Sequence, residues 1–194
     1  LGGEGSVINV EASRLDINSA LDGDFLAEGE AINISNAGKL NLTAATADSE
    51  IAGTIAVTGR DSSLSIAGVG TAALTGQISL ADNADLFVES TLNVEKDGVI
   101  FAGGKSSSAA VSVEAGSILN LNEGSSLALT DGSHLINKGA VNVNGGTVTL
   151  QSNGYIRNMG TSTTFNGGQF NIETDALIDG GFVFSTKTTG IKIK

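Results

Sequence analysis

AGSILNLNEGSSLALTDGSHLINKGAVNVNGGTVTL, residues 115–150, has a glycine at every seventh or eighth position. Each glycine is followed by a short run in which apolar and polar residues alternate: ILNL, SLAL, HLIN, AVNV and TVTL. Alternation with a period of two indicates a half-buried β-strand, and glycine and asparagine favour the sharp bends between strands. The stretch therefore predicts five short strands joined by tight turns, with no helix.

A longer period joins these strands into a larger unit. Residues 141–150 read VNVNGGTVTL and residues 163–172 read TTFNGGQFNI, so Asn144-Gly145 superposes on Asn166-Gly167 at an offset of 22 residues. Three strand-and-turn steps also add up to about 22 residues, which is one coil of a three-sided parallel β-helix. A β-sandwich is disfavoured, since its turns come every 8–12 residues or so. Parallel stacking predicts that the side chains of Asn144 and Asn166 form a ladder of amides.

The first half of the chain repeats less regularly. Residues 19–30 and 102–110 do not fit the pitch and are predicted to be loops that leave the coil; a short capping helix is the alternative for 19–30. We interpret residues 1–194 as a single β-helix domain of about nine coils, roughly 40 Å long at about 4.8 Å per coil. The opening Leu1-Gly2-Gly3 looks like the middle of a sequence, so we expect a fragment of a longer chain.

Composition and charge argue against several classes of partner. The formal net charge is −11, and it is uneven: residues 1–97 contain 15 acidic and 4 basic side chains, whereas residues 98–194 contain 6 of each. An acidic surface repels nucleic acid and anionic lipid. No apolar run approaches the roughly 18 residues of a membrane helix, so we expect no membrane insertion of this segment. The chain has no cysteine, which removes disulfides and thiolate catalysis and fits an exported bacterial protein.

Few residue patterns point to chemistry. The only histidine, His134, lies in a predicted strand and is interpreted as a solvent-facing or turn-adjacent residue. The densest acidic segment is LDGDFLAEGE, residues 21–30, which is interpreted as a solvated loop or, alternatively, as a weak cation site with hard oxygen ligands. Its acidic residues are Asp22, Asp24, Glu28 and Glu30. No catalytic residue, cofactor site or firm metal site is predicted, and we expect that the protein is not an enzyme.

Aromatic residues make up 4% of the chain, and four of the seven phenylalanines lie near the C-terminus. Their alternation favours stacking in the core over a platform for sugars; they are Phe165, Phe170, Phe182 and Phe184. Tyr155 alternates with Ile156, so one of the two faces outward. Tyr155 is therefore the candidate for an exposed aromatic contact.

The repeated G-[ST]-x-L-x-L, NGG-T-V-T-L and N-x-G patterns, in an acidic chain rich in Gly, Ala, Asn, Ser and Thr, resemble the passenger region of bacterial autotransporter adhesins. The resemblance is to the AIDA-like, self-associating type, is strongest over residues 111–184, and is shared with filamentous-haemagglutinin-like exoproteins. It implies a right-handed parallel β-helix that is secreted and displayed outside the outer membrane. It also implies adhesion to a host-cell surface protein or glycan, or self-association and biofilm formation.

Two alternatives remain open at this stage. A carbohydrate-active β-helix, such as a lyase or glycosidase, would need two or three carboxylates that converge on one face of adjacent coils. A passive spacer would hold another domain away from the membrane and would bind nothing. For self-association, we expect Asn, Thr and Ser side chains along one face to provide many weak hydrogen bonds.

Overall fold

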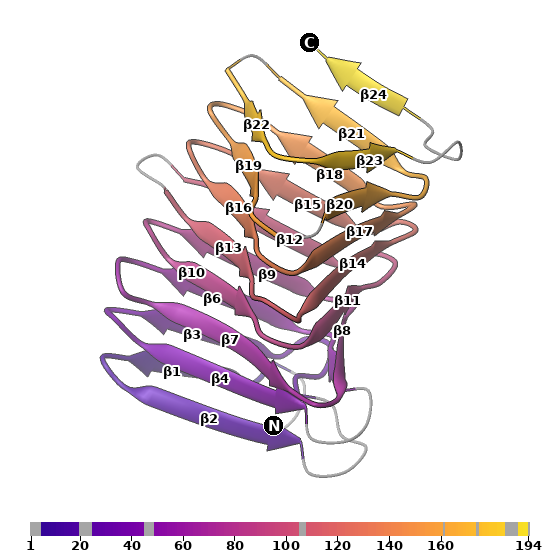
Figure 1. The fold of residues 1–194 in the computed structure, drawn as a ribbon. Coiled ribbons are helices and arrows are strands. Elements are labelled where there is room, and N and C mark those ends of the chain that lie inside the picture. Colours follow the sequence, from indigo (N-terminus) through magenta and orange to yellow (C-terminus); the bar gives the residue numbers. More distant parts are fainter. Residues whose placement is uncertain are drawn as a thin grey trace.

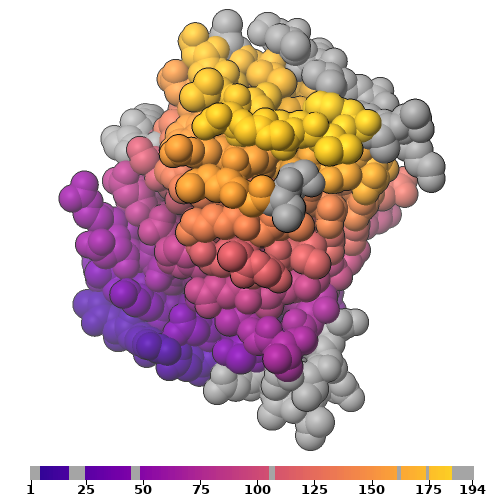
Figure 2. Space-filling view, viewed as in Figure 1, coloured from indigo at the N-terminus to yellow at the C-terminus, as the bar shows by residue number. Residues whose placement is uncertain are grey.

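A computed structural model describes residues 5–19, 25–44, 49–104, 108–160, 162–173, 175–184 and 190–193. Within these ranges every regular element is a β-strand, and all strand pairs are parallel, in three sheets. The chain winds around three sides and advances by one strand per sheet with each coil (Figure 1). In the space-filling view, colour changes steadily from one end of the molecule to the other (Figure 2). The predicted all-β, three-sided parallel solenoid is confirmed.

Consecutive strands belong to different sheets, which we call A, B and C. Sheet A contains β1 (Val7–Glu11), β3 (Ala31–Ser35), β6 (Thr54–Thr58), β9 (Gln77–Ala81), β12 (Val99–Ala102), β15 (Ser126–Leu129), β18 (Thr147–Leu150), β21 (Gln169–Ile172) and β24 (Gly190–Ile193). Sheet B contains β2 (Arg14–Ser19), β4 (Lys39–Ala44), β7 (Ser63–Gly68), β10 (Asp85–Val88), β13 (Ala110–Val113), β16 (His134–Asn137), β19 (Tyr155–Asn158) and β22 (Leu177–Asp179). Sheet C contains β5 (Ser49–Ile51), β8 (Thr71–Leu74), β11 (Thr91–Val94), β14 (Ile118–Asn122), β17 (Ala140–Asn144), β20 (Ser162–Phe165) and β23 (Phe182–Phe184).

The strand register agrees with the offset read from the sequence. Val141 pairs with Thr163 in sheet C, and Thr147 pairs with Gln169 in sheet A, in both cases 22 residues apart. The predicted number of about nine coils holds only for sheet A, because the described residues form nine, eight and seven strands in the three sheets. The hand of the coil stays a prediction from the resemblance.

The core is a column of aliphatic side chains inside the three sheets. In β9, for example, Ile78 and Leu80 are fully buried, whereas Ser79 between them lies on the outer face. Burying one such side chain contributes roughly 1.5–3 kcal/mol. Because each inward residue stacks on its counterpart in the next coil, as Ile78 does on Ile100, the core is continuous along the axis.

Aromatic stacking closes the core near the C-terminal end. The rings of Phe165 and Phe170 are buried and lie 5.0 Å apart, and Phe184 lies 5.0 Å from Phe165 on the other side. Phe184 is 42% exposed because it belongs to the last strand of sheet C. The predicted stacking of these phenylalanines is present, but burial in the core is confirmed only for Phe165 and Phe170.

Glycine and asparagine occupy the left-handed region at many corners, as predicted, for example at Gly116, Gly132 and Asn153, but two further features were not expected. Several bends place aspartate, rather than glycine, in the left-handed region, as at Asp61 (φ 66°) and Asp82 (φ 55°). Gly76, by contrast, has no left-handed φ; a Cβ there would overlap the carbonyl oxygens of Gly53 and Ala52 in the preceding coil. Some glycines therefore permit close stacking of coils, and part of the acidic charge is located where aspartate tolerates a bend.

The two predicted loops need correction at their boundaries. Residues 20–24 lie outside the described residues, but Leu26 is buried and forms a parallel bridge with Ile51, so the coil has resumed by that point and 19–30 is too long. Ser19 likewise still pairs with Ala44. The 102–110 segment, of which 105–107 are not described, fits an insertion, since Val99 and its partner Ser126 are 27 residues apart.

Candidate functional site

Sheet C has a ladder of asparagine amides along the middle of its outer face. The Nδ2 of Asn120 donates to Oδ1 of Asn93 at 2.8 Å, and the Nδ2 of Asn142 donates to Oδ1 of Asn120 at 2.9 Å. The three residues are register partners in β11, β14 and β17. Parallel, in-register strands place identical side chains directly above one another in successive coils. Each amide can therefore form a hydrogen bond to the next amide along the solenoid axis.

A second ladder runs along the edge of the same sheet and contains the residues predicted from the sequence. Asn166 donates to Asn144 at 3.2 Å, Asn144 to Asn122 at 3.5 Å, and Asn122 to a carboxylate oxygen of Glu95 at 3.0 Å. Gly145 follows Asn144 with a φ of 97°, and Gly167 follows Asn166 with a φ of 121°. The expected stacking of Asn144 on Asn166 is therefore present, and its role in binding stays a prediction.

Tyr155 lies on the outer face of sheet B but presents little of its ring face. Its ring stacks on that of His134 in the preceding coil, with centroids 4.7 Å apart and planes 4° from parallel. Leu177 is its register partner on the other side, and Ile156 is buried in the core, as the alternation predicted. Partial burial lowers the pKa of His134, against a smaller opposing effect of the Gly132 backbone. The stack thus covers one face of the Tyr155 ring.

The acidic candidate for a cation site is not assembled among the described residues. Asp22 and Asp24 lie outside them, and Glu28 is exposed. Glu30 is only 2% exposed, and its carboxylate accepts a hydrogen bond from the backbone N–H of Ala27 at 3.0 Å. Glu30 therefore stabilises a turn and does not face solvent as a ligand would. No group of three or more His, Asp or Glu suited to a metal occurs in the part of the chain that the structure describes.

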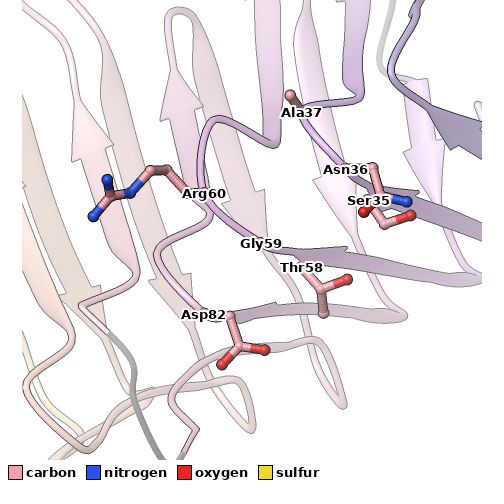
Figure 3. A pocket seen from close by; sticks show the side chains of 7 residues that line it. All are labelled: Ser35, Asn36, Ala37, Thr58, Gly59, Arg60 and Asp82. Atoms are coloured by element: carbon pink, nitrogen blue, oxygen red, sulfur yellow. The ribbon is translucent and has the colours of Figure 1, made fainter.

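An open groove of about 400 Å³ lies at the corner between sheets A and B, at the N-terminal end of the molecule (Figure 3). It is lined by Ser35, Asn36, Ala37, Thr58, Gly59, Arg60 and Asp82. The Arg60 side chain extends away from the hydroxyl groups of Ser35 and Thr58, and no ion pair among the described residues includes it. Sequence reasoning missed this groove because its residues come from three coils, with no shared motif.

One carboxyl group near this groove, that of Asp85, has a shifted pKa. Burial raises the pKa of Asp85, and the nearby negative charge of Asp61 raises it further. Asp85 begins β10, while Asp61 belongs to the preceding turn of the corner. A raised carboxyl pKa near a second carboxylate is one feature of the acid that a glycosidase uses.

The described residues contain no helix with the length and apolar character that a membrane span requires.

Comparisons with known proteins assign no family to the chain and do not bear on its fold. No family model matches the chain, and no curated protein matches it. Among solved structures, a TibC-catalysed, hyper-glycosylated fragment of TibA is similar at 12% identity, over 100% of this chain and 94% of that chain, with a TM-score of 0.17. A TM-score this low carries no argument about what the chain does.

Proposed function

We propose that this chain is an adhesive segment of a secreted bacterial autotransporter passenger, displayed at the cell surface. In that role it binds a host-cell surface protein or glycan, or a second copy of itself, and promotes attachment and biofilm formation. The observation that carries the proposal is the shape: a parallel solenoid offers three extended outer faces, and the face of sheet C has a ladder of asparagine side chains. The pattern shared with adhesin passengers agrees with it. The proposal assigns no catalytic residue and no cofactor.

The experiment compares the purified chain with a spacer of the same shape. Beads coated with the chain are tested for attachment to cultured epithelial cells and for aggregation with each other. A matched set of beads carries a β-helix of similar length without adhesive activity. Attachment or aggregation above the control supports an adhesive segment, whereas equality in both assays favours a passive spacer and refutes the proposal.

One observation favours a second candidate, a carbohydrate-active β-helix. Asp61 and Asp85 interact at the corner that also contains Asp82 and the groove of Figure 3, and the raised pKa of Asp85 suits a general acid. Incubation with acidic and neutral polysaccharides, followed by a reducing-end assay, tests this candidate. Release of new reducing ends by the native chain, and its loss in Asp85→Asn, would establish it in place of simple adhesion.

A further inference from the structure

Three asparagines of this chain, Asn144, Asn153 and Asn166, are followed directly by glycine. In an Asn-Gly pair the backbone nitrogen of the glycine can attack the side-chain amide, because glycine has no Cβ to hinder its approach. The attack requires rotation of the peptide plane between the two residues. A hydrogen bond that holds this plane therefore protects the asparagine, and the three sites differ in such bonds.

The peptide plane after Asn153 is held by a turn. The N–H of Gly154 donates to the carbonyl oxygen of Gln151 at 2.8 Å. Rotation of the plane would break this bond, at a cost of about 0.5–1.5 kcal/mol or more. Asn153 itself lies in the left-handed region, at φ 67°. The nitrogen that would attack is thus kept in a hydrogen bond.

Asn144 is held at both its backbone and its side chain. Gly145, the residue that follows it, forms an antiparallel bridge with Asn122 of the preceding coil. The side-chain amide is bonded at both ends, since Nδ2 donates to Asn122 at 3.5 Å and Oδ1 accepts from Asn166 at 3.2 Å. Movement of this amide toward the backbone would break both rungs of the ladder.

Asn166 lacks most of these restraints. It is exposed and begins the bend over residues 166–168, directly after β20. Among the described residues, neither the carbonyl oxygen of Asn166 nor the N–H of Gly167 takes part in a hydrogen bond. The side chain is bonded only through Nδ2, to Asn144 at 3.2 Å. The peptide plane after Asn166 can therefore rotate without the loss of a backbone hydrogen bond.

We propose that Asn166 is a site of spontaneous deamidation in the folded protein, and that Asn144 and Asn153 are protected. The backbone nitrogen of Gly167 forms a bond to Cγ of Asn166 and loses its proton. The bond between Cγ and Nδ2 breaks, and the amide leaves as ammonia with that proton. Water then opens the resulting succinimide ring at either carbonyl, to aspartate or isoaspartate. Nothing is oxidised or reduced, and solvent water is the only co-reactant.

Deamidation changes the edge ladder of sheet C. The donor Nδ2 of Asn166 is lost, and a carboxylate oxygen then faces Oδ1 of Asn144, where two acceptors repel each other. Residues 98–194, which contain 6 acidic and 6 basic side chains, also gain one negative charge. The modification thus weakens the contact between two coils and makes the neutral half of the molecule acidic.

Isoaspartate has a second effect, because it adds one methylene group to the backbone. The segment has little space for it. Phe165, on one side, is fully buried in the core. Gly168, on the other side, lies so close to the preceding coil that a Cβ would overlap the carbonyl oxygen of Gly146. We therefore expect the C-terminal coils to lose stability as the protein ages. This inference goes beyond the proposed adhesive function and does not depend on it.

The first experiment follows deamidation of the wild-type chain in mildly alkaline buffer, both folded and unfolded in urea. Trypsin cuts after Lys138, Arg157 and Lys187, so Asn166 lies on a different peptide from the other two sites. Mass spectrometry with fragmentation measures each site, and an isoaspartyl methyltransferase assay detects isoaspartate. In the folded chain, Asn166 is expected to react about tenfold faster than either other site, and in urea all three rates are expected to agree within about threefold.

The second experiment measures the consequence for stability. Asn166→Asp reproduces the aspartate product. Asn153→Asp is the matched control, because it places aspartate at a left-handed corner position like that of Asp131, which has a φ of 54°. In urea unfolding, Asn166→Asp is expected to lower the transition midpoint, whereas the control stays close to wild type. Aged wild type that contains isoaspartate is expected to fall below Asn166→Asp.

The two experiments test separate parts of the inference. Equal rates at the three sites of the folded chain, or a faster reaction at Asn144 or Asn153, would overturn the assignment of Asn166. Equal midpoints for Asn166→Asp and Asn153→Asp would overturn the predicted weakening of the ladder. Neither result bears on adhesion, which the bead assay of the fresh chain decides by itself.

Discussion

Replacement of Gly76 by alanine tests whether the corners of the solenoid depend on the absence of a side chain. Gly76 connects sheet C to sheet A, and its φ lies outside the left-handed region. A Cβ there would overlap the carbonyl oxygens of Gly53 and Ala52 in the coil below. Because these are backbone atoms, they cannot move aside as the end of a flexible side chain can, and the two coils must separate.

The size of the effect follows from the hydrogen bonds at this corner. The N–H of Gly76 donates to the carbonyl of Ile51, and the N–H of Gln77 donates to the carbonyl of Gly53, both at 3.0 Å. A buried polar group left without its partner costs about 1–3 kcal/mol, so loss of both bonds lowers the free energy of unfolding by about 2–6 kcal/mol. Gly116→Ala is the matched control: its φ is 84° and a Cβ there meets nothing within 4 Å. We expect it to cost only the left-handed strain of alanine, about 1–2 kcal/mol.

Urea-induced unfolding, followed by far-ultraviolet circular dichroism, measures both variants against wild type. The comparison requires similar m values, so that differences in the transition midpoint report stability rather than a change in the unfolded state. If Gly76→Ala proves no more destabilising than Gly116→Ala, close stacking of coils is not the reason for glycine at this corner.

Three further perturbations address the ladder, a buried carboxylate and the aromatic core. Asn120→Ala removes both hydrogen bonds to its ladder neighbours and is expected to lower the free energy of unfolding in urea by about 1–3 kcal/mol; an unchanged midpoint would mean that water replaces the amide at no cost. The raised pKa of Asp85 means that the folded state binds this proton more readily, so wild type loses stability as pH rises from the ordinary value of 3.8 through the raised value. Because burial is the main cause of this raised pKa, Asp85→Asn should be more stable than wild type at pH 7 and less dependent on pH in thermal unfolding; a wild-type stability that does not fall as pH rises through this range would contradict the assignment. Phe165→Ala is expected to cost about 3–5 kcal/mol in urea unfolding, and Phe184→Ala clearly less because that ring is 42% exposed; equal losses would contradict the assigned burial.

The sequence determined the architecture and one ladder because both follow from periodicity. Alternation decides which side chains face inward, and a repeat of 22 residues places equivalent residues over one another in parallel strands. Asn144 and Asn166 could be paired in this way from two copies of NGG, and their amides do bond at 3.2 Å. The clustering of phenylalanines followed from the same alternation.

Only the tertiary structure decided what the corners and the outer faces present. The groove formed by Ser35, Thr58 and Asp82 joins residues from three coils that share no sequence motif at these positions, so the sequence does not mark it. The sequence predicts a solvated Glu30, but this carboxylate is buried and accepts a hydrogen bond from a backbone N–H. The sequence predicts an exposed Tyr155 ring, but His134 covers one side of it. The physical reason is common to all three: burial in a solenoid depends on the neighbouring coils, and the sequence of one coil does not contain that information.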